Sequence, residues 1–518
     1  MNPVGALRWI MLATVTSATI VGLDALPVSV EADVGQGLPS FSIVGLPDAA
    51  VQEARERVRA AIRNSRFEMP PRRTVVNLAP GDRRKEGPAL DLPIALAVLI
   101  ATAQLPQEAV RGYLAIGELA LDGSLRPVPG VLAITQTARA LGARGLLLPA
   151  LNATEAAVLE EVPVYALPTL RAAVEHLQGI RPIQASAGAV SDPPPDGPAS
   201  LDLADVRGQP AARRALEIAA AGGLNLLLVG PPGVGKTMLA RRFPTILPPL
   251  LRGEAVEVTK IYSVAGLLPP HSGLIWQRPF RSPHHTASAS AIVGGGTSPR
   301  PGEITLAHHG VLFLDELPEF HTDVLQVLRQ PLEEGAVVVA RASGTVRLPA
   351  RFAFIGAMNP CPCGYRGDQR RECTCTPGQV QRYLARLSGP LLDRIDLHVE
   401  VPRPPTDDLL SGLPGEPSDA IRARVLAARG QAARRTAQAG SPTGVLRGVQ
   451  RWGPVEASAL AFTRTAAERF VLGARATERV LRIGRAIADL EGAERVTTAH
   501  LAEALQYRVL DRRGARSP

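Results

Sequence analysis

The chain has 518 residues, which is more than one hydrophobic core supports and enough for three or four domains. Apolar residues make up 46% and charged residues 20%, so a wholly disordered chain is excluded. The formal net charge is +9, and residues 421–518 alone carry 18 Arg against 8 Asp and Glu. A basic lobe on a nearly neutral body suggests a polyanionic partner, although a solvated helical surface has the same composition.

The first 180 residues are predicted to form a unit of mixed helices and strands. We expect two short strands within 11–35, helices at 49–65, 92–102 and 131–141, and further strands at 74–78, 112–121 and 145–149. Met11 is an alternative start, which would make residues 1–10 a dispensable extension. Polar residues interrupt the apolar stretch 9–30 and no long charge-free apolar run follows, so we expect a cytoplasmic protein without a membrane partner.

Three further segments follow. Residues 181–200 contain five prolines among small residues and are predicted to be a linker. Residues 201–405 alternate helices with strands, with a helix at 209–221 and strands at 224–229, 311–314 and 353–357, which favours a parallel sheet covered by helices. Residues 406–518 are rich in Ala, Arg and Leu without a strand-like run, and are predicted to be a separate helical domain.

A glycine-rich turn lies between the apolar strand and the next helix of the second unit. It matches G-x-x-x-x-G-K-[ST], in which backbone amides and a helix N-terminus surround phosphate oxygens. The lysine reaches the β- and γ-phosphates and the threonine hydroxyl ligates Mg²⁺, so ATP and Mg²⁺ are the expected cofactors. The residues of this loop are Gly230, Pro231, Pro232, Gly233, Val234, Gly235, Lys236 and Thr237, and Lys236 is one of only three lysines in the chain.

Two more apolar strands end in polar side chains. Asp315 and Glu316 follow 311–314, where we expect Asp315 to hold the Mg²⁺ shell and Glu316 to polarise the attacking water. The alternative is an acidic N-cap on the next helix. Asn359 follows the strand near 353–357 and is predicted to orient water at the γ-phosphate, unless it is only a turn residue.

These motifs together resemble an AAA+ ATPase module. Long stretches also resemble the Mg-chelatase-like ComM/YifB family: 281–286 (RSPHHT), Pro301-Gly-Glu303, Ala307–Phe320 and Gly389–Asp396. The resemblance implies a homohexameric ring in which Arg394 is an arginine finger inserted into the neighbouring ATP site, and Arg475 the sensor-2 arginine. From the residues alone, Arg394 can instead pair with Asp393 or Asp396, and Arg479 and Arg482 lie on the same helix as Arg475.

All four cysteines of the chain lie in one short segment, as the two C-x-C pairs Cys361, Cys363 and Cys373, Cys375. Four thiolates on a short loop can bind Zn²⁺ tetrahedrally with no open position, which is typical of a structural site. Reduced thiols or a redox pair are the alternatives. With no other cysteine available, a disulfide-stapled secreted fold is not expected.

The N-terminal unit resembles the ribosomal S5 domain 2-like fold of the Lon protease proteolytic domain. The matching stretches are 85–91 (KEGPALD) and 117–123 (GELALDG). Ala89 stands where a Lon-type protease has its serine, and residues 131–139 contain no lysine, so we expect no peptidase activity. Lys85 is expected to be an ordinary surface charge.

Two basic segments are candidates for contact with DNA as the substrate of such a ring. A predicted hairpin over 335–347 carries Arg341 near its tip and can project into a ring's pore, and the segment with Lys260, Arg278, Arg281, His284 and His285 is a second candidate DNA contact. The family resemblance implies an ATP-driven DNA motor, a helicase for branch migration during homologous recombination and natural transformation. A low aromatic content of 4% argues against sequence-specific single-strand readout. The alternative is a chelatase-like or chaperone-like remodeller with a protein partner.

Overall fold

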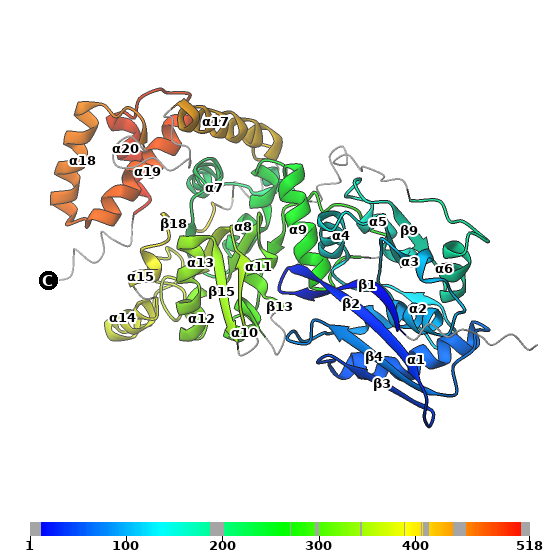
Figure 1. The fold of residues 1–518 in the computed structure, drawn as a ribbon. Coiled ribbons are helices and arrows are strands. Elements are labelled where there is room, and N and C mark those ends of the chain that lie inside the picture. Colours follow the sequence, from blue (N-terminus) through cyan, green and yellow to red (C-terminus); the bar gives the residue numbers. More distant parts are fainter. Residues whose placement is uncertain are drawn as a thin grey trace, which may run out of the picture.

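The computed structural model describes residues 12–186, 201–269, 271–295, 300–341, 344–387, 389–405, 407, 414–438 and 452–508. Within these ranges the chain forms a mixed α+β part, a parallel α/β part and a helical part, in that order (Figure 1). The predicted extension 1–10 and most of the predicted linker, residues 187–200, lie outside the described residues.

The first part is built around a seven-stranded mixed sheet with strand order β3-β4-β2-β1-β5-β8-β9. The two strands expected to be short, β1 (Leu12–Val21) and β2 (Asp24–Gly35), instead form an antiparallel hairpin of 10 and 12 residues. The other strands are β3 (Ser40–Val44), β4 (Arg73–Ala79), β5 (Tyr113–Ala115), β8 (Gly145–Pro149) and β9 (Val164–Leu167). The strand predicted over 112–121 breaks at Gly117, whose φ is +155°, and continues as β6 (Glu118–Leu119), which pairs with β7 (Leu125–Arg126).

The predicted helices of this part are confirmed as α1 (Ala49–Asn64), α2 (Asp91–Ala101) and α4 (Val131–Ala140). Every residue of α2 is buried, because its sequence is apolar all round and it packs between the β1–β2 hairpin and α1. Its first residue, Asp91, accepts hydrogen bonds from Arg57 Nε (2.7 Å) and Nη2 (3.0 Å). The short helices are α3 (Gln107–Val110), α5 (Ala153–Ala156) and α6 (Leu170–Leu177).

Lys85 is buried, so the expectation that it is a surface charge is wrong. Its ammonium donates to the carbonyl oxygen of Pro80, and burial lowers the pKa of Lys85. The reason lies in the backbone: Lys85 N–H donates to Leu46 O and Lys85 O accepts from Asp48 N–H, which ties this loop to the segment between β3 and α1. The side chain is thereby carried inward, where a carbonyl replaces water.

The second part contains a five-stranded sheet in the order β11-β14-β17-β10-β18, with every neighbouring pair parallel. Its strands are β10 (Leu226–Val229), β11 (Phe280–Arg281), β14 (Val311–Leu314), β17 (Ala353–Met358) and β18 (Leu397–Glu400). The predicted parallel sheet is therefore confirmed. Because the strands run the same way, the carboxyl ends of β10, β14 and β17 meet at one edge and the start of β18 lies at the other.

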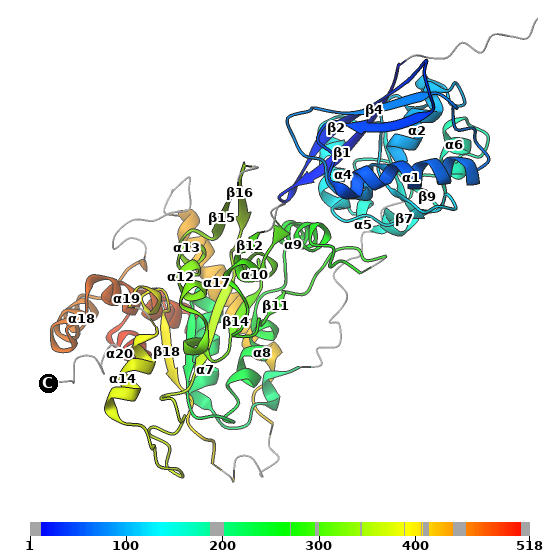
Figure 2. The same ribbon diagram turned by 90° about the horizontal axis from the view of Figure 1, so that it is seen from below.

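Helices and short hairpins complete this part (Figure 2). The longer helices are α7 (Pro210–Gly222), α8 (Lys236–Ile246), α9 (Arg252–Val264) and α14 (Pro377–Ala385). The shorter ones are α10 (Ala289–Val293), α11 (Glu303–Leu306), α12 (Thr322–Val327), α13 (Arg329–Glu334) and α15 (Gly389–Leu392). The hairpins are β12 (Gly294–Gly295) with β13 (Arg300–Pro301), and β15 (Ala336–Arg341) with β16 (Gly344–Pro349), which confirms the hairpin predicted near 335–347. Residues 342–343 and the side chain of Arg341 lie outside the described residues.

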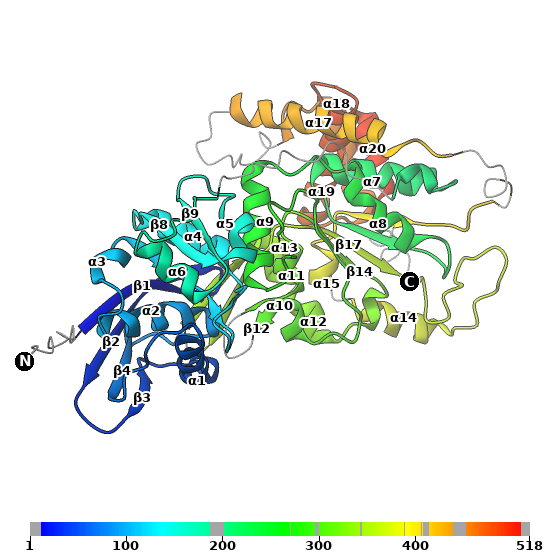
Figure 3. The ribbon, with the colours of Figure 1, turned by 90° about the vertical axis from the view of Figure 1, so that its right-hand side faces the viewer.

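The helical part consists of α17 (Ser418–Gln438), α18 (Ala457–Phe470), α19 (Ala474–Leu490) and α20 (Thr498–Gln506), with α17 and α19 packed on α7 (Figure 3). Several of its arginines are held by groups of this part or of α7. Arg435 makes a bidentate pair with Asp489 (2.7 and 2.9 Å), and Arg429 donates to Ala220 O (2.6 and 2.8 Å). Part of the positive charge of this lobe therefore stabilises its own packing. No helix among the described residues is long and apolar enough to span a membrane.

Helix α9 joins the first part to the second. Lys260 forms an ion pair with Asp24 at the tip of the β1–β2 hairpin (2.7 Å), and Ser263 donates a hydrogen bond to the buried carboxylate of Glu155. Leu23, at the same tip, packs in the apolar cluster that also contains Leu348 of β16. A Cβ on Gly22 would lie 2.5 Å from Val346 Cγ1, so the tip of the β1–β2 hairpin packs against β16 as well as α9.

The buried Arg57–Asp91 pair generates a stability prediction. The substitution Asp91→Asn leaves the guanidinium and the Leu119 amide with a weaker acceptor in the core, so the local free energy of opening of α2 should fall by about 3 kcal/mol. Hydrogen exchange of the α2 amides in the full chain measures this loss. The exposed Asp82→Asn is the control and should leave α2 protection unchanged. Equal protection in both variants would contradict the assigned role of the pair.

Candidate functional site

The glycine-rich loop connects β10 to α8 at the carboxyl edge of the parallel sheet. Gly233 (φ +77°) and Gly235 (φ +94°) have left-handed backbone conformations, which side chains with a Cβ rarely adopt. A Cβ on Gly230 would lie 2.2 Å from the carbonyl oxygen of Val401, so the loop also needs glycine where it passes the end of β18. These three glycines shape a loop that opens the N-terminus of α8 toward solvent.

Lys236 is the first residue of α8, and 8% of it is exposed. Its ammonium donates to Gly230 O (2.7 Å), Pro231 O (2.9 Å) and Asn359 Oδ1 (3.1 Å). Burial lowers the pKa of Lys236, while the carboxylates of Asp315 and Glu316 act in the opposite direction. The lysine is therefore a desolvated cation whose acceptors are neutral oxygens. A charged phosphate oxygen is a stronger acceptor for the ammonium than these oxygens are.

The predicted carboxylates lie at the end of β14, next to this loop. Thr237 Oγ1 donates to Asp315 Oδ2 (2.7 Å), which brings together the hydroxyl and the carboxylate predicted to hold Mg²⁺. Glu316 has φ +52° and ψ +44°, an unfavourable backbone conformation for a residue other than glycine, and its side chain is 54% exposed. Strain of this kind is typical of functional positions.

Residues from separate motifs line one cavity of about 420 Å³. The structure places Asn359 at its wall together with both carboxylates, although these residues are more than 40 positions apart in the chain. The lining residues are Pro232, Gly233, Val234, Gly235, Lys236, Thr237, Met238, Asp315, Glu316, Met358 and Asn359. The loop amides, the ammonium and the Thr237–Asp315 pair supply the donors and oxygen ligands that a nucleoside triphosphate with Mg²⁺ requires, so the residues present fit that group.

One neighbour of this cavity was not singled out for it from the sequence. His285 Nδ1 lies 3.4 Å from Glu316 Oε2, at the carboxyl edge of the sheet. The sequence placed His285 among candidate DNA contacts, and only the fold brings it to the predicted water-polarising carboxylate. The signal available in the sequence was the unusual His284-His285 pair itself.

The two predicted catalytic arginines lie elsewhere. Arg394 precedes β18 at the amino edge of the sheet, where its carbonyl accepts a hydrogen bond from Asn225, just before β10. Its guanidinium pairs with Glu333 of α13, and not with Asp393 or Asp396 as the alternative proposed. Arg475, at the start of α19, pairs with Asp393 (3.4 Å) and is 67% exposed. Arg394 and Arg475 thus share the edge opposite the cavity.

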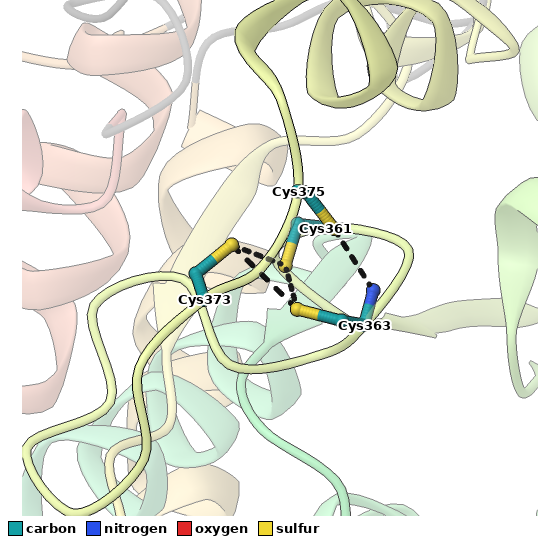
Figure 4. Close-up of side chains that lie close together, drawn as sticks. All are labelled: Cys361, Cys363, Cys373 and Cys375. Atoms are coloured by element: carbon teal, nitrogen blue, oxygen red, sulfur yellow. Dashed lines mark hydrogen bonds between the residues drawn. The ribbon is translucent and has the colours of Figure 1, made fainter.

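The four cysteine sulfur atoms converge on one point, all within 4.8 Å of one another (Figure 4). Cys361 Sγ lies 3.4 Å from Cys363 Sγ and 3.6 Å from Cys373 Sγ, and Cys375 Sγ accepts a hydrogen bond from Cys363 N–H (3.3 Å). Sulfur atoms at these distances are not joined as disulfides, which leaves four ligands facing one centre. A hydrogen bond from the backbone of Tyr365 lowers the pKa of the Cys363 thiol to about 6.

The second predicted DNA-contacting segment is largely neutralised. Lys260 pairs with Asp24, Arg278 with Glu254 (3.2 Å), and Arg281 with Glu303 through two hydrogen bonds of 2.7 Å. These cations hold α9, β11 and α11 in place. As candidates for phosphate contact they are weaker than the sequence indicated.

Sequence comparisons place this site in a family. The profile of "Magnesium chelatase, subunit ChlI" matches residues 202–409, that of "Subunit ChlI of Mg-chelatase" residues 30–152, and that of the ChlI C-terminal region residues 415–508. The chain is 43% identical to protein YifB of Salmonella typhimurium over 504 residues and to competence protein ComM of Haemophilus influenzae over 509 residues, covering 97% of this chain and 98% of each relative. The chain belongs to the Mg-chelatase-like ComM/YifB family.

Part of the chain is also similar to a magnesium-chelatase subunit. The magnesium-chelatase 38 kDa subunit of Rhodobacter capsulatus is 26% identical over 196 residues, which cover 35% of this chain. Membership of the ComM/YifB family indicates an ATPase that uses ATP and Mg²⁺, in agreement with the donors and ligands that line the cavity.

The position of Glu316 beside the cavity predicts that its carboxylate is needed for ATP hydrolysis and not for ATP binding. Glu316→Gln keeps the size of the side chain but removes its basicity, so ATP affinity should be retained while kcat falls by about 10²-fold or more. Steady-state hydrolysis and equilibrium binding of a fluorescent ATP analogue measure the two effects. Glu319→Gln, on the same turn but paired with Arg386, is the control and should hydrolyse ATP normally. A Glu316→Gln enzyme with unchanged kcat would contradict this role.

Proposed function

We propose that this chain is the subunit of a homohexameric, ATP-driven ring that moves DNA, with branch migration of recombination intermediates as its reaction. The ATP site is assigned to Gly230–Thr237, Asp315, Glu316 and Asn359. Its cofactors are ATP and Mg²⁺. The competence role is suggested by the name of the Haemophilus influenzae relative.

The position of Arg394 is the observation that supports a ring. Hydrolysis of a phosphoanhydride generally needs a cation at the γ-phosphate beyond the loop lysine. Arg394 lies at the amino edge of the sheet and the cavity at the carboxyl edge, so this guanidinium cannot reach the nucleotide of its own subunit. Packing the amino edge of one subunit on the carboxyl edge of the next supplies the missing cation, and such a head-to-tail contact forms a ring when the rotation between subunits closes on itself.

The steps at the site follow from the charges of its residues. The loop amides and Lys236 bind the phosphates, while Thr237 and Asp315 would hold Mg²⁺, whose charge would polarise the γ-phosphate. Glu316 accepts a proton from the attacking water, and Asn359 orients that water and fixes Lys236 through their shared hydrogen bond. The neighbour's Arg394 leaves Glu333 and stabilises the charge that develops on the leaving oxygens.

The β15–β16 hairpin supports DNA as the substrate. It projects from the second part beside the tip of the β1–β2 hairpin, and Arg347 of β16 lies on the strand opposite Val338 (Figure 2). A hairpin presented by each subunit would ring the central channel with cations that contact the phosphate backbone without reading bases. The alternative is a remodeller of a protein partner. The similarity to the magnesium-chelatase subunit favours this alternative.

DNA should therefore stimulate hydrolysis. We expect branched DNA to raise the ATPase rate several-fold at low salt, and the stimulation to fall steeply as salt increases because phosphate contacts release counterions. Steady-state ATPase assays with and without a four-way junction measure this, with Lys236→Ala as the inactive control. Rates that no DNA changes but that a partner protein raises would favour the remodeller.

Complementation should show that the site is shared between subunits. Arg394→Ala and Lys236→Ala are each expected to be inactive, but a 1:1 mixture should recover activity. In the mixed ring an intact loop of one variant meets an intact Arg394 of the other. ATPase assays of each variant and of the mixture measure this, with a mixture of Arg394→Ala and Arg394→Lys as the control. A mixture as inactive as its components would contradict the shared site.

A further inference from the structure

The segment between β17 and α14 carries a feature that nucleotide binding alone does not require. It places every cysteine of the chain around one centre, directly behind Asn359. Three of the Sγ–Sγ distances are 3.4–3.6 Å. A tetrahedral Zn²⁺ with Zn–S bonds of about 2.3 Å needs sulfur atoms about 3.8 Å apart. The sulfur atoms of Cys361, Cys363 and Cys373 are thus within a few tenths of an ångström of the spacing in a four-thiolate zinc site, and that of Cys375 lies within 4.8 Å of each of them.

The surroundings suit a closed metal site. Cys361 is fully buried and the other three cysteines are partly exposed, and the backbone N–H of Cys363 donates to Cys375 Sγ, as outer-shell groups do in zinc sites. Four thiolates on Zn²⁺ carry a net charge of about −2. Arg382 lines the hollow beside Cys363 and Cys375, together with the ion pair of Arg386 and Glu319. Only cysteines contribute ligands, so no coordination position is left for a substrate.

This cluster is in contact with the ATP site. Gly364, in the turn of the first pair, has φ +87°, and a Cβ there would lie 2.8 Å from Pro232 Cδ and 3.8 Å from Asn359 Cγ. The turn is therefore packed against both the phosphate loop and Asn359. Pro360 alone separates Asn359 from Cys361.

The second cysteine pair links the same point to α14. Cys375 is followed by Thr376, which caps the N-terminus of α14 by accepting a hydrogen bond from Gln379 N–H. Tyr383 of that helix is buried and lines the hollow beside Cys363 and Cys375. One ion at the cluster would thus lock the end of β17, the turn at Gly364 and the start of α14 together.

We propose that Cys361, Cys363, Cys373 and Cys375 bind one Zn²⁺ ion and that this ion is a positioning device, which holds Asn359 and the phosphate loop in the geometry for ATP hydrolysis. The second half rests on the proposed ATPase function, while the metal site itself does not. On binding, the four thiols lose their protons to solvent and the ion loses its water ligands, with no change of oxidation state. Without the ion, the turn at Gly364 no longer holds Asn359 in place. The distance between Lys236 Nζ and Asn359 Oδ1 then varies.

Metal content and spectroscopy test the site directly. The full chain purified without chelators should contain one zinc per subunit by elemental analysis. Replacing it with Co²⁺ should give the intense thiolate-to-metal absorption and the visible bands of a tetrahedral site. The double variant Cys363→Ser, Cys375→Ser should lose both, while Glu372→Gln, an exposed residue of the same loop, should keep them. Absence of zinc and of the cobalt spectrum in the wild-type chain would overturn the site, whatever its ATPase activity.

Kinetics test the positioning role. In the double variant kcat for ATP hydrolysis should fall about tenfold or more, whereas the affinity for a fluorescent ATP analogue should change less than about threefold, because the loop amides and Lys236 remain. A variant that binds no metal yet keeps its kcat would overturn the positioning role. A wild-type chain with zinc but no hydrolysis would instead overturn the proposed ATPase.

A titration guards against a variant that does not fold. All four cysteines of the chain belong to the cluster, so a mercurial thiol reagent reacts nowhere else. Zinc release to a chelating dye and loss of ATPase activity should proceed in parallel, with far-ultraviolet circular dichroism unchanged. Zinc release that precedes any loss of activity would contradict the proposal.

Discussion

The polarity of one parallel sheet is the constraint on which the rest of this structure depends. Because β10, β14 and β17 run in the same direction, their carboxyl ends bring Lys236, Asp315 and Asn359 to one edge. The same polarity puts Arg394, which precedes β18, at the opposite edge. In the proposed ring, a single subunit holds the phosphate-binding half of the chemistry and presents Arg394 to its neighbour. Family membership, the cavity and the proposed ring are consistent with this division.

The parts of the site that the sequence predicts well are local. The loop Gly230–Thr237 and the acids after β14 are recognisable because strand, turn and helix signals surround them within a few residues, and backbone geometry then leaves little choice. The convergence of the cysteines was also foreseen, since only nine residues separate the two pairs. Strand β11, by contrast, has two residues and no periodicity to reveal it.

The predictions that were wrong concern side chains whose partners lie far away in the sequence. The prediction that Lys85 is a surface charge was wrong because backbone hydrogen bonds to Leu46 and Asp48 carry its side chain inward. The partners of Arg281 and Arg394, which are Glu303 and Glu333, cannot be read from composition. The same holds for the basic lobe: its formal charge is a property of the sequence, but which arginines pair internally is a property of the packing.

In the proposed ring, Arg394 of one subunit completes the ATP site of the next. The most direct measurement is a structure of the assembled protein with Mg²⁺, a non-hydrolysable ATP analogue and branched DNA. We expect a ring in which the Arg394 guanidinium has left Glu333 and lies within hydrogen-bonding distance of the γ-phosphate bound by the neighbouring subunit. An assembly in which Arg394 stays paired with Glu333 in every subunit, and another cation meets the γ-phosphate, would contradict it.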